Sequence, residues 1–194
     1  SAILATVLGT AAAYALNMTS SRLVRSLQML LLLPLVVPIV ITAVGVFLVY
    51  AQVGLLASMT GLILANMMLG LPYVVISVLV GLRKFDATQE MVSRSLGMNR
   101  LRTFFVVTLP QIRPSVISGM LFAFISAIDE TVVSLFISGG EYQTLTKRMF
   151  TALRDEIDPT IAAISSLLTA ISFILVMLVA LNARSADRKQ GKVA

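Results

Sequence analysis

The chain contains no cysteine and no histidine, and only 12% of its 194 residues are charged. A protein without these two residue types has no disulfide, no Cys/His zinc site and no histidine-based catalytic triad. The phosphate-binding sequence G-x-x-x-x-G-K-[ST] is also absent, so the chain itself is not expected to hydrolyse ATP. The sequence therefore predicts a protein that is not an enzyme and carries no metal or cofactor.

Hydrophobic residues make up 58% of the chain, whereas soluble domains contain roughly 45–50%. A soluble domain of this size could not bury so much apolar surface, so the expected solvent is lipid. The formal net charge of +6 is, in so apolar a chain, more typical of the cytoplasmic loops of a membrane protein than of nucleic-acid binding. We therefore expect contact with membrane lipid and none with nucleic acid.

A helix that crosses the roughly 30 Å hydrocarbon core needs about 20 mostly apolar residues. Five apolar runs, the first of them short, lie at about 2–16, 27–50, 55–80, 115–138 and 160–181. They predict an all-α fold, a polytopic helical membrane protein with spans in residues 1–181 and a polar tail at 182–194. Pro34 and Pro38 predict a bend in the second run, and Gly70 and Pro72 one in the third. Such bends occur in ordinary membrane helices and also around transport pathways.

Basic residues are distributed unevenly between the connections. Twelve of the fifteen lie after the first run, in the loop 83–114 or in the tail, and the other three lie in 139–159. Because Lys and Arg stay preferentially on the cytoplasmic side, the first group and the C-terminus are predicted to be cytoplasmic. Ser1 then lies near the outer face, and the odd number of crossings predicts at least one further helix before it, giving six.

The loop 83–114, called the elbow below, has the pattern of two short helices. Asp86 and Gln89 are spaced as a helix N-cap and its reciprocal partner, which predicts a helix that starts at Ala87. Gly97 is a typical helix end, because glycine tolerates positive φ.

The second half of the elbow predicts another helix, Arg100–Thr108, capped by Asn99. Pro110 and Pro114 are then expected to redirect the chain into the next span. Such an elbow suits two surroundings: it can lie on anionic lipid headgroups, or it can dock onto another protein. The apolar side chains expected along it are Met91, Val92, Leu96, Leu101, Phe104 and Phe105.

The second half also carries a family motif. Gly97 is followed, after nine residues, by Val107-Thr108-Leu109-Pro110. This spacing resembles the EAA loop of ABC importer permeases, which reads Glu-Ala-Ala, three residues, Gly, nine residues, Ile-x-Leu-Pro. Met91-Val92-Ser93 stand where the family has Glu-Ala-Ala, and Glu90 places the acid one position early.

The resemblance extends over most of the chain and is greatest to the spermidine/putrescine-type permeases. Three further segments carry it: LPLVVP at 33–38, LPYVV at 71–75 and FISAIDETVV at 124–133. It implies a multi-pass subunit of a type I ABC importer in the bacterial inner membrane, paired with a second permease subunit. In such importers a cytoplasmic ATPase dimer binds the elbow, and an extracytoplasmic solute-binding protein delivers the small-molecule substrate.

The resemblance also implies roles for particular residues and a class of substrate. The positions that it assigns to ATPase coupling are Glu90, Met91, Ser93, Gly97, Leu101, Phe104, Leu109 and Pro110. The implied substrate is a cationic, polyamine-like solute. The alternatives within the family are an amino acid derivative, an opine, a phosphonate or a metal. Outside the family, the alternative is a channel-like or structural membrane protein.

Two acids, Asp129 and Glu130, lie about fourteen residues into the fourth run, roughly 21 Å from its cytoplasmic start. A charge within a span is costly, so it needs water, a partner or a substrate. Either acid could pair structurally with Lys147, Arg148 or a residue of a partner subunit, line a pathway for a cationic solute, or sit at the interface of a tilted helix. Because adjacent helical residues point about 100° apart, only one of them need face a pathway.

A short amphipathic helix is expected between the last two runs. Leu145, Met149, Leu153 and Ile157 recur there at a spacing of four. This helix could rest on the outer membrane surface as a connector, or it could dock the solute-binding protein.

Overall fold

The computed structural model describes residues 1–18, 21–155 and 159–190. Within these ranges every regular element is helical, and strand-like pairing is limited to one isolated bridge between Gly139 and Tyr142. The predicted all-α class is therefore confirmed. The elements are α1 (Ala2–Asn17), α2 (Arg22–Leu32), the 3₁₀ turn η1 (Leu33–Leu35), α3 (Ile39–Val53), α4 (Met59–Lys84), α5 (Thr88–Ser95), α6 (Arg100–Thr103), the π turn η2 (Phe104–Thr108), α7 (Leu109–Asp129), α8 (Val132–Ile137), α9 (Leu145–Asp155) and α10 (Pro159–Gln190).

In the described part of the chain, two helices are long and apolar enough to cross a membrane. They are α4, with 26 residues, and the continuous helix Arg100–Asp129, with 30. A third candidate is the bent pair Arg22–Leu35 and Ile39–Val53, whose halves meet at 103°. α1 and the segment Ala162–Met177 of α10 are apolar but shorter. The five crossings expected from the sequence remain a prediction.

The bend between α2 and α3 falls at the two prolines of the second run. The 3₁₀ turn Leu33–Leu35 offers its first carbonyl to the N–H groups of Val36 and Val37, at 3.0 and 3.1 Å. Pro38 has no N–H and disfavours a helical residue before it, so the chain starts a new helix at Ile39. The second run is therefore two helices rather than one straight span.

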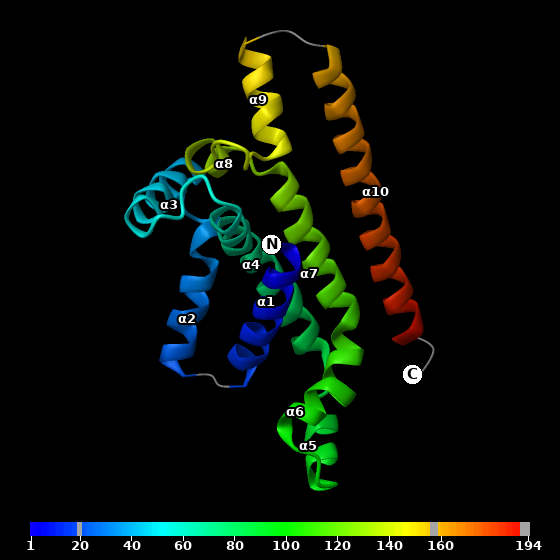
Figure 1. The fold of residues 1–194 in the computed structure, drawn as a ribbon. Coiled ribbons are helices and arrows are strands. Elements are labelled where there is room, and N and C mark those ends of the chain that lie inside the picture. Colours follow the sequence, from blue (N-terminus) through cyan, green and yellow to red (C-terminus); the bar gives the residue numbers. More distant parts are fainter. Residues whose placement is uncertain (19–20, 156–158, 191–194) are drawn as a thin grey trace.

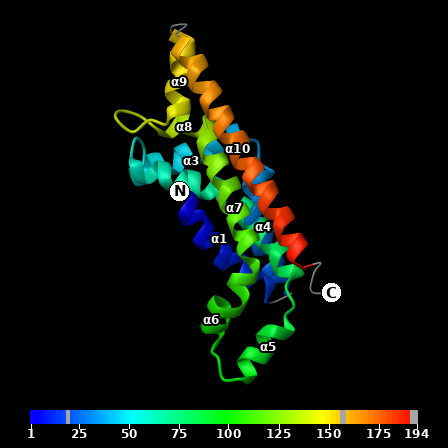
Figure 2. The ribbon, with the colours of Figure 1, turned by 90° about the vertical axis from the view of Figure 1, so that its right-hand side faces the viewer.

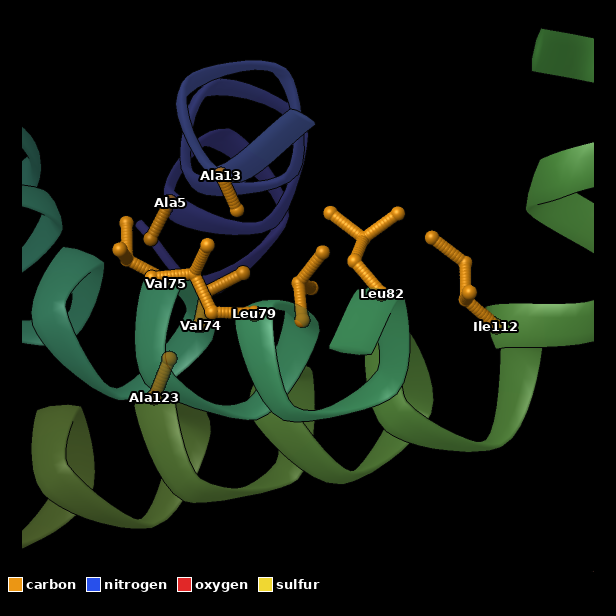
Figure 3. Close-up of a cluster of buried hydrophobic side chains, with 9 residues drawn as sticks. Ala5, Ala13, Val74, Val75, Leu79, Leu82, Ile112 and Ala123 are labelled. Carbon is orange, nitrogen blue, oxygen red and sulfur yellow. The ribbon is translucent and has the colours of Figure 1, made fainter. Parts of the chain in front are cut away.

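α4 is the central helix, and α1 and α7 pack on it (Figure 3). Val74 of α4 is fully buried, and each neighbour places a glycine against it. A Cβ on Gly9 would lie 2.8 Å from the Val74 Cβ, and a Cβ on Gly119 would lie 2.9 Å from the Val74 Cα. Helices surrounded by lipid have no hydrophobic driving force to associate. Close backbone packing of this kind therefore holds the three helices together.

The connections fall at two ends of the helix bundle (Figures 1 and 2). The elbow, the C-terminal end of α1, the N-terminal end of α2 and the C-terminal end of α10 lie toward one end. The turn from α3 to α4 and helix α9 lie toward the other. A second apolar cluster, Ala43, Leu62, Ala65, Leu69, Val133 and Ile137, joins α3 and α8 to α4.

Two predicted stretches differ in detail from the structure. The fourth run, 115–138, is divided, because α7 ends at Asp129 and α8 begins at Val132. The predicted polar tail begins as helix, because α10 continues to Gln190. Residues 191–194 lie outside the described residues, as does Ile157 of the expected amphipathic helix.

Replacing Gly119 with alanine should destabilise the fold. The added methyl meets the Val74 backbone, which cannot rotate away, and overpacking of this kind costs about 1–3 kcal/mol. Thermal unfolding of the detergent-solubilised protein should therefore show a lower Tm. Gly45→Ala in α3 is the control, because beyond the backbone of its own helix turn nothing lies within 4 Å of its new Cβ. An equal Tm for Gly119→Ala and the wild type would contradict the packing argument.

Candidate functional site

The first helix of the elbow, α5, is closed at both ends by local hydrogen bonds. The Asp86 carboxylate accepts from the Thr88 N–H at 2.9 Å, and this hydrogen bonding lowers the pKa of the Asp86 carboxyl. The helix begins at Thr88 rather than at the predicted Ala87. The expected reciprocal bond from Gln89 does not form, because the Gln89 side chain accepts a hydrogen bond from Gln111 of α7 instead.

Gly97 ends α5 as the sequence predicted. Its φ of 92° is in the left-handed region, which favours glycine. The Gly97 N–H donates to the Arg94 carbonyl at 3.0 Å, and the Met98 N–H donates to the Ser93 carbonyl at 3.2 Å. This pair of bonds is the Schellman arrangement, and it turns the chain sharply between the two halves of the elbow.

The second half starts at the predicted cap but does not end where the sequence predicted. The Asn99 side chain accepts from the Arg102 N–H at 2.8 Å. The helix is then not redirected at Pro110 and Pro114; it continues into α7 through the π turn Phe104–Thr108. Because Pro110 has no N–H and its ring crowds the preceding turn, one widened turn lets the helix pass without a break.

The widened turn brings two hydroxyls onto one face. Thr103 and Thr108 are five residues apart and would point about 140° apart on a regular α-helix. With the π turn between them, both face α5, and both are fully buried. Thr103 accepts a hydrogen bond from Ser93 at 3.3 Å, and Thr108 donates to Glu90, so both hydroxyls hold α5.

Glu90 connects three helices. Its Oε1 accepts from the Thr108 hydroxyl, and its Oε2 accepts from the Tyr14 hydroxyl of α1 at 3.4 Å. The Tyr14 ring also packs on Phe104, with ring centroids 4.5 Å apart. The carboxylate therefore points into the junction between elbow and bundle, not outward.

Several large apolar side chains of the elbow point outward. Leu96 is 78% exposed and Leu101 is 72% exposed. Exposed Arg94, Arg100 and Arg102 accompany them. The elbow's apolar surface, as we define it, consists of Met91, Val92, Leu96, Leu101 and Phe105.

The two acids after α7 have different surroundings. The Glu130 carboxylate is half-buried and accepts from the Val133 N–H at 2.6 Å, so it caps α8. Asp129 is exposed at the last position of α7. The suggested partner Lys147 donates its ammonium to the Ser138 carbonyl at 2.5 Å.

Comparison with known proteins identifies the family. Residues 5–188 match the family described as binding-protein-dependent transport system inner membrane component. The chain belongs to this family. It is therefore the permease subunit of a type I ABC importer, a multi-pass protein of the inner membrane.

Individual relatives agree with this assignment. The spermidine/putrescine permease PotC of Haemophilus influenzae is 29% identical over 177 residues, covering 91% of this chain and 69% of PotC. The putrescine permease PotI of Escherichia coli is 35% identical over 141 residues, covering 70% of this chain and 50% of PotI. The molybdenum permease ModB of Mycobacterium tuberculosis is 33% identical over 193 residues, covering 92% of this chain and 72% of ModB.

A solved structure gives the fold. An inward-facing structure of the MetNI methionine ABC transporter aligns with a TM-score of 0.66 at 17% identity, covering 100% of this chain and 89% of that one. The likeness supports the helical arrangement of a permease and nothing finer.

The structure divides the eight positions that resemblance assigned to coupling. Met91, Gly97, Leu101 and Pro110 are exposed, whereas Ser93 is buried and Glu90, Phe104 and Leu109 are half-buried. The second group lies inside the elbow or against the bundle. Sequence reasoning missed Tyr14, because nothing in the spacing of α1 relates it to a residue 76 positions away.

Proposed function

We propose that this permease subunit moves a small cationic, polyamine-like solute and that a separate cytoplasmic ATPase dimer drives it by binding the elbow. In this proposal a second permease subunit completes the pathway, and an extracytoplasmic solute-binding protein delivers the solute. The observation that carries the proposal is the elbow's apolar surface, which stands outside the helix bundle with arginines around it.

Exposed apolar clusters on an ordered element mark a contact with protein or membrane. Both views show the elbow projecting beyond the ends of α1 and α2 rather than lying across them (Figures 1 and 2). A helix that rests on headgroups lies in the plane of the interface. The projecting elbow therefore favours a protein partner.

The partner must supply energy, because this chain has no phosphate-binding loop. An ATPase that binds the elbow differently in its open and closed states would shift the permease between two conformations. In this account Met91 and Leu101 contact the ATPase, and Gly97 shapes the turn between them. Glu90, Ser93, Phe104 and Leu109 hold the elbow in place from within, and the exposed Pro110 lies where the elbow continues into α7.

The charge of the solute is argued from Asp129. Relatives named for polyamines and for molybdenum match this chain to a similar degree, so overall identity does not select the solute. Asp129 adds a carboxylate to the C-terminal end of α7, where the helix dipole is already negative. The Asp129 carboxylate and the negative end of the α7 dipole together attract a cation. Glu130 is engaged as a cap, so we assign the pathway role to Asp129.

Leu101→Asp should weaken ATPase binding by about tenfold or more, because burial of a leucine is worth roughly 1.5–3 kcal/mol. The measurement is co-purification in mild detergent, with the ATPase recognised by its phosphate-loop sequence. Leu153→Asp in α9 is the matched control, since Leu153 is also an exposed leucine but lies toward the opposite end. Full ATPase recovery with Leu101→Asp would indicate that the elbow rests on lipid.

Asp129→Asn should raise the polyamine concentration needed for half-maximal uptake by about tenfold, the scale of a charge-assisted hydrogen bond. Uptake is measured in proteoliposomes that contain the complete importer. Glu130→Gln removes the neighbouring charge but keeps an oxygen for the Val133 N–H, so it should retain near-wild-type uptake and Tm. A larger loss in Glu130→Gln than in Asp129→Asn would reverse the assignment.

A further inference from the structure

α1 is bound to the elbow although the two are far apart in the sequence. The Tyr14 hydroxyl donates to Glu90 of α5 at 3.4 Å, across a separation of 76 residues. The Tyr14 ring packs on Phe104 at the beginning of the π turn, with an interplanar angle of 48°. One side chain of α1 therefore holds both halves of the elbow.

The aromatic contact continues to the outside of the elbow. Phe104 packs edge-on against Phe105, with centroids 5.2 Å apart and planes at 75°. Phe105 belongs to the elbow's apolar surface and is 61% exposed. Phe105, Phe104 and Tyr14 thus form an unbroken aromatic path from that surface to α1.

The polar side of the same junction is fixed by the elbow itself. Glu90 is held by Thr108, and the Ser93 hydroxyl bonds both the Glu90 carbonyl, at 3.0 Å, and the Thr103 hydroxyl. Both threonines are fully buried. Glu90 and Phe104 therefore belong to one stiff unit. A displacement of the elbow moves both of these residues, and Tyr14 contacts both of them.

We propose that Tyr14 is the positioning residue that couples α1 to the elbow, so that α1 follows the elbow when the ATPase moves it. The proposal rests on the proposed docking of the ATPase at the elbow. α1 is one continuous helix from Ala2 to Asn17, so it transmits a displacement of Tyr14 along its length. Without the Tyr14 contacts, the elbow can move while α1 stays behind.

The test separates binding, hydrolysis and uptake in the complete importer. Tyr14→Ala should still co-purify with the ATPase and hydrolyse ATP, but the ATP consumed per solute taken up should rise about fivefold or more, the scale of a lost conformational coupling. Tyr14→Phe keeps the ring contact and loses the hydroxyl. Its ratio of ATP consumed to solute taken up should therefore lie between those of the wild type and Tyr14→Ala. Tyr50→Phe is the matched control, because the Tyr50 hydroxyl donates to the Gly61 carbonyl at 3.2 Å, away from the elbow. Its ratio should equal that of the wild type.

Glu90 variants test the other side of the contact. Both of its partners are hydroxyls, which can donate or accept, so Glu90→Gln should keep the wild-type ratio. Glu90→Ala loses both hydrogen bonds but leaves the Tyr14 ring on Phe104, so its ratio of ATP consumed to solute taken up should be raised at least as much as that of Tyr14→Phe. If Glu90→Ala raises the ratio of ATP consumed to solute taken up and Glu90→Gln does not, a general loss of stability cannot explain the effect.

Three results would overturn the proposal. An unchanged ratio in Tyr14→Ala, with intact ATPase binding, rejects the link while leaving ATPase docking in place. Loss of ATPase binding in Tyr14→Ala shows that Tyr14 supports docking rather than transmission. Failure of the wild-type permease to bind the ATPase rejects the proposed function and this inference together.

Discussion

The close approach of α1 and α7 to α4 around Val74 is the contact on which the rest of the molecule depends. In lipid, the hydrophobic effect does not hold these helices together, so close packing at glycine and alanine stabilises their contact. α4 leads directly into the elbow, and the elbow leads directly into α7. Fixing these two helices against each other fixes both points at which the elbow leaves the membrane, and placing α1 beside them brings Tyr14 to the junction.

The form of the elbow follows from a few polar groups and one widened turn. The Schellman end at Gly97 reverses the chain, and the π turn places Thr103 and Thr108 on the face that meets α5. Once hydroxyls and the Glu90 carboxylate fill the inside, Leu96, Leu101 and their apolar neighbours are left outside. A small hairpin of this kind can present an apolar surface because its interior is stabilised by hydrogen bonds rather than by a core of its own.

Features set by neighbouring residues were predictable from the sequence. The bend at Pro34 and Pro38, the end of α5 at Gly97 and the Asn99 cap are local. The apolar pattern of the elbow was local too, although Phe104 in that pattern turns inward onto Tyr14. Gly97 and the Leu109-Pro110 motif also led to the family that the comparisons show. Whole-chain hydropathy gave the all-α membrane class for the same reason, because each span is a property of about 20 consecutive residues.

The remaining features depend on residues distant in sequence or on helix geometry that hydropathy does not encode. Pro110 was expected to redirect the chain, but the helix continues past it through the π turn Phe104–Thr108. Gln89 was expected to cap its own helix, but it meets Gln111. The adjacent acids looked alike in the sequence, and only the start of α8 separates the capping Glu130 from the exposed Asp129. Tyr14 carries no motif at all.

The central claim is that the elbow's apolar surface lies in the cytoplasm and is covered by the ATPase. Because the chain has no cysteine, a single Leu96→Cys can report on this surface. The control is Gln143→Cys, an exposed position just before α9, which lies toward the opposite end. The rate of labelling by an impermeant thiol reagent is the measurement. The account predicts that Leu96→Cys is labelled in inside-out vesicles and is protected by added ATPase, whereas Gln143→Cys is labelled in right-side-out vesicles and is not protected. Labelling of Leu96→Cys from outside, or at an unchanged rate with saturating ATPase, would contradict it.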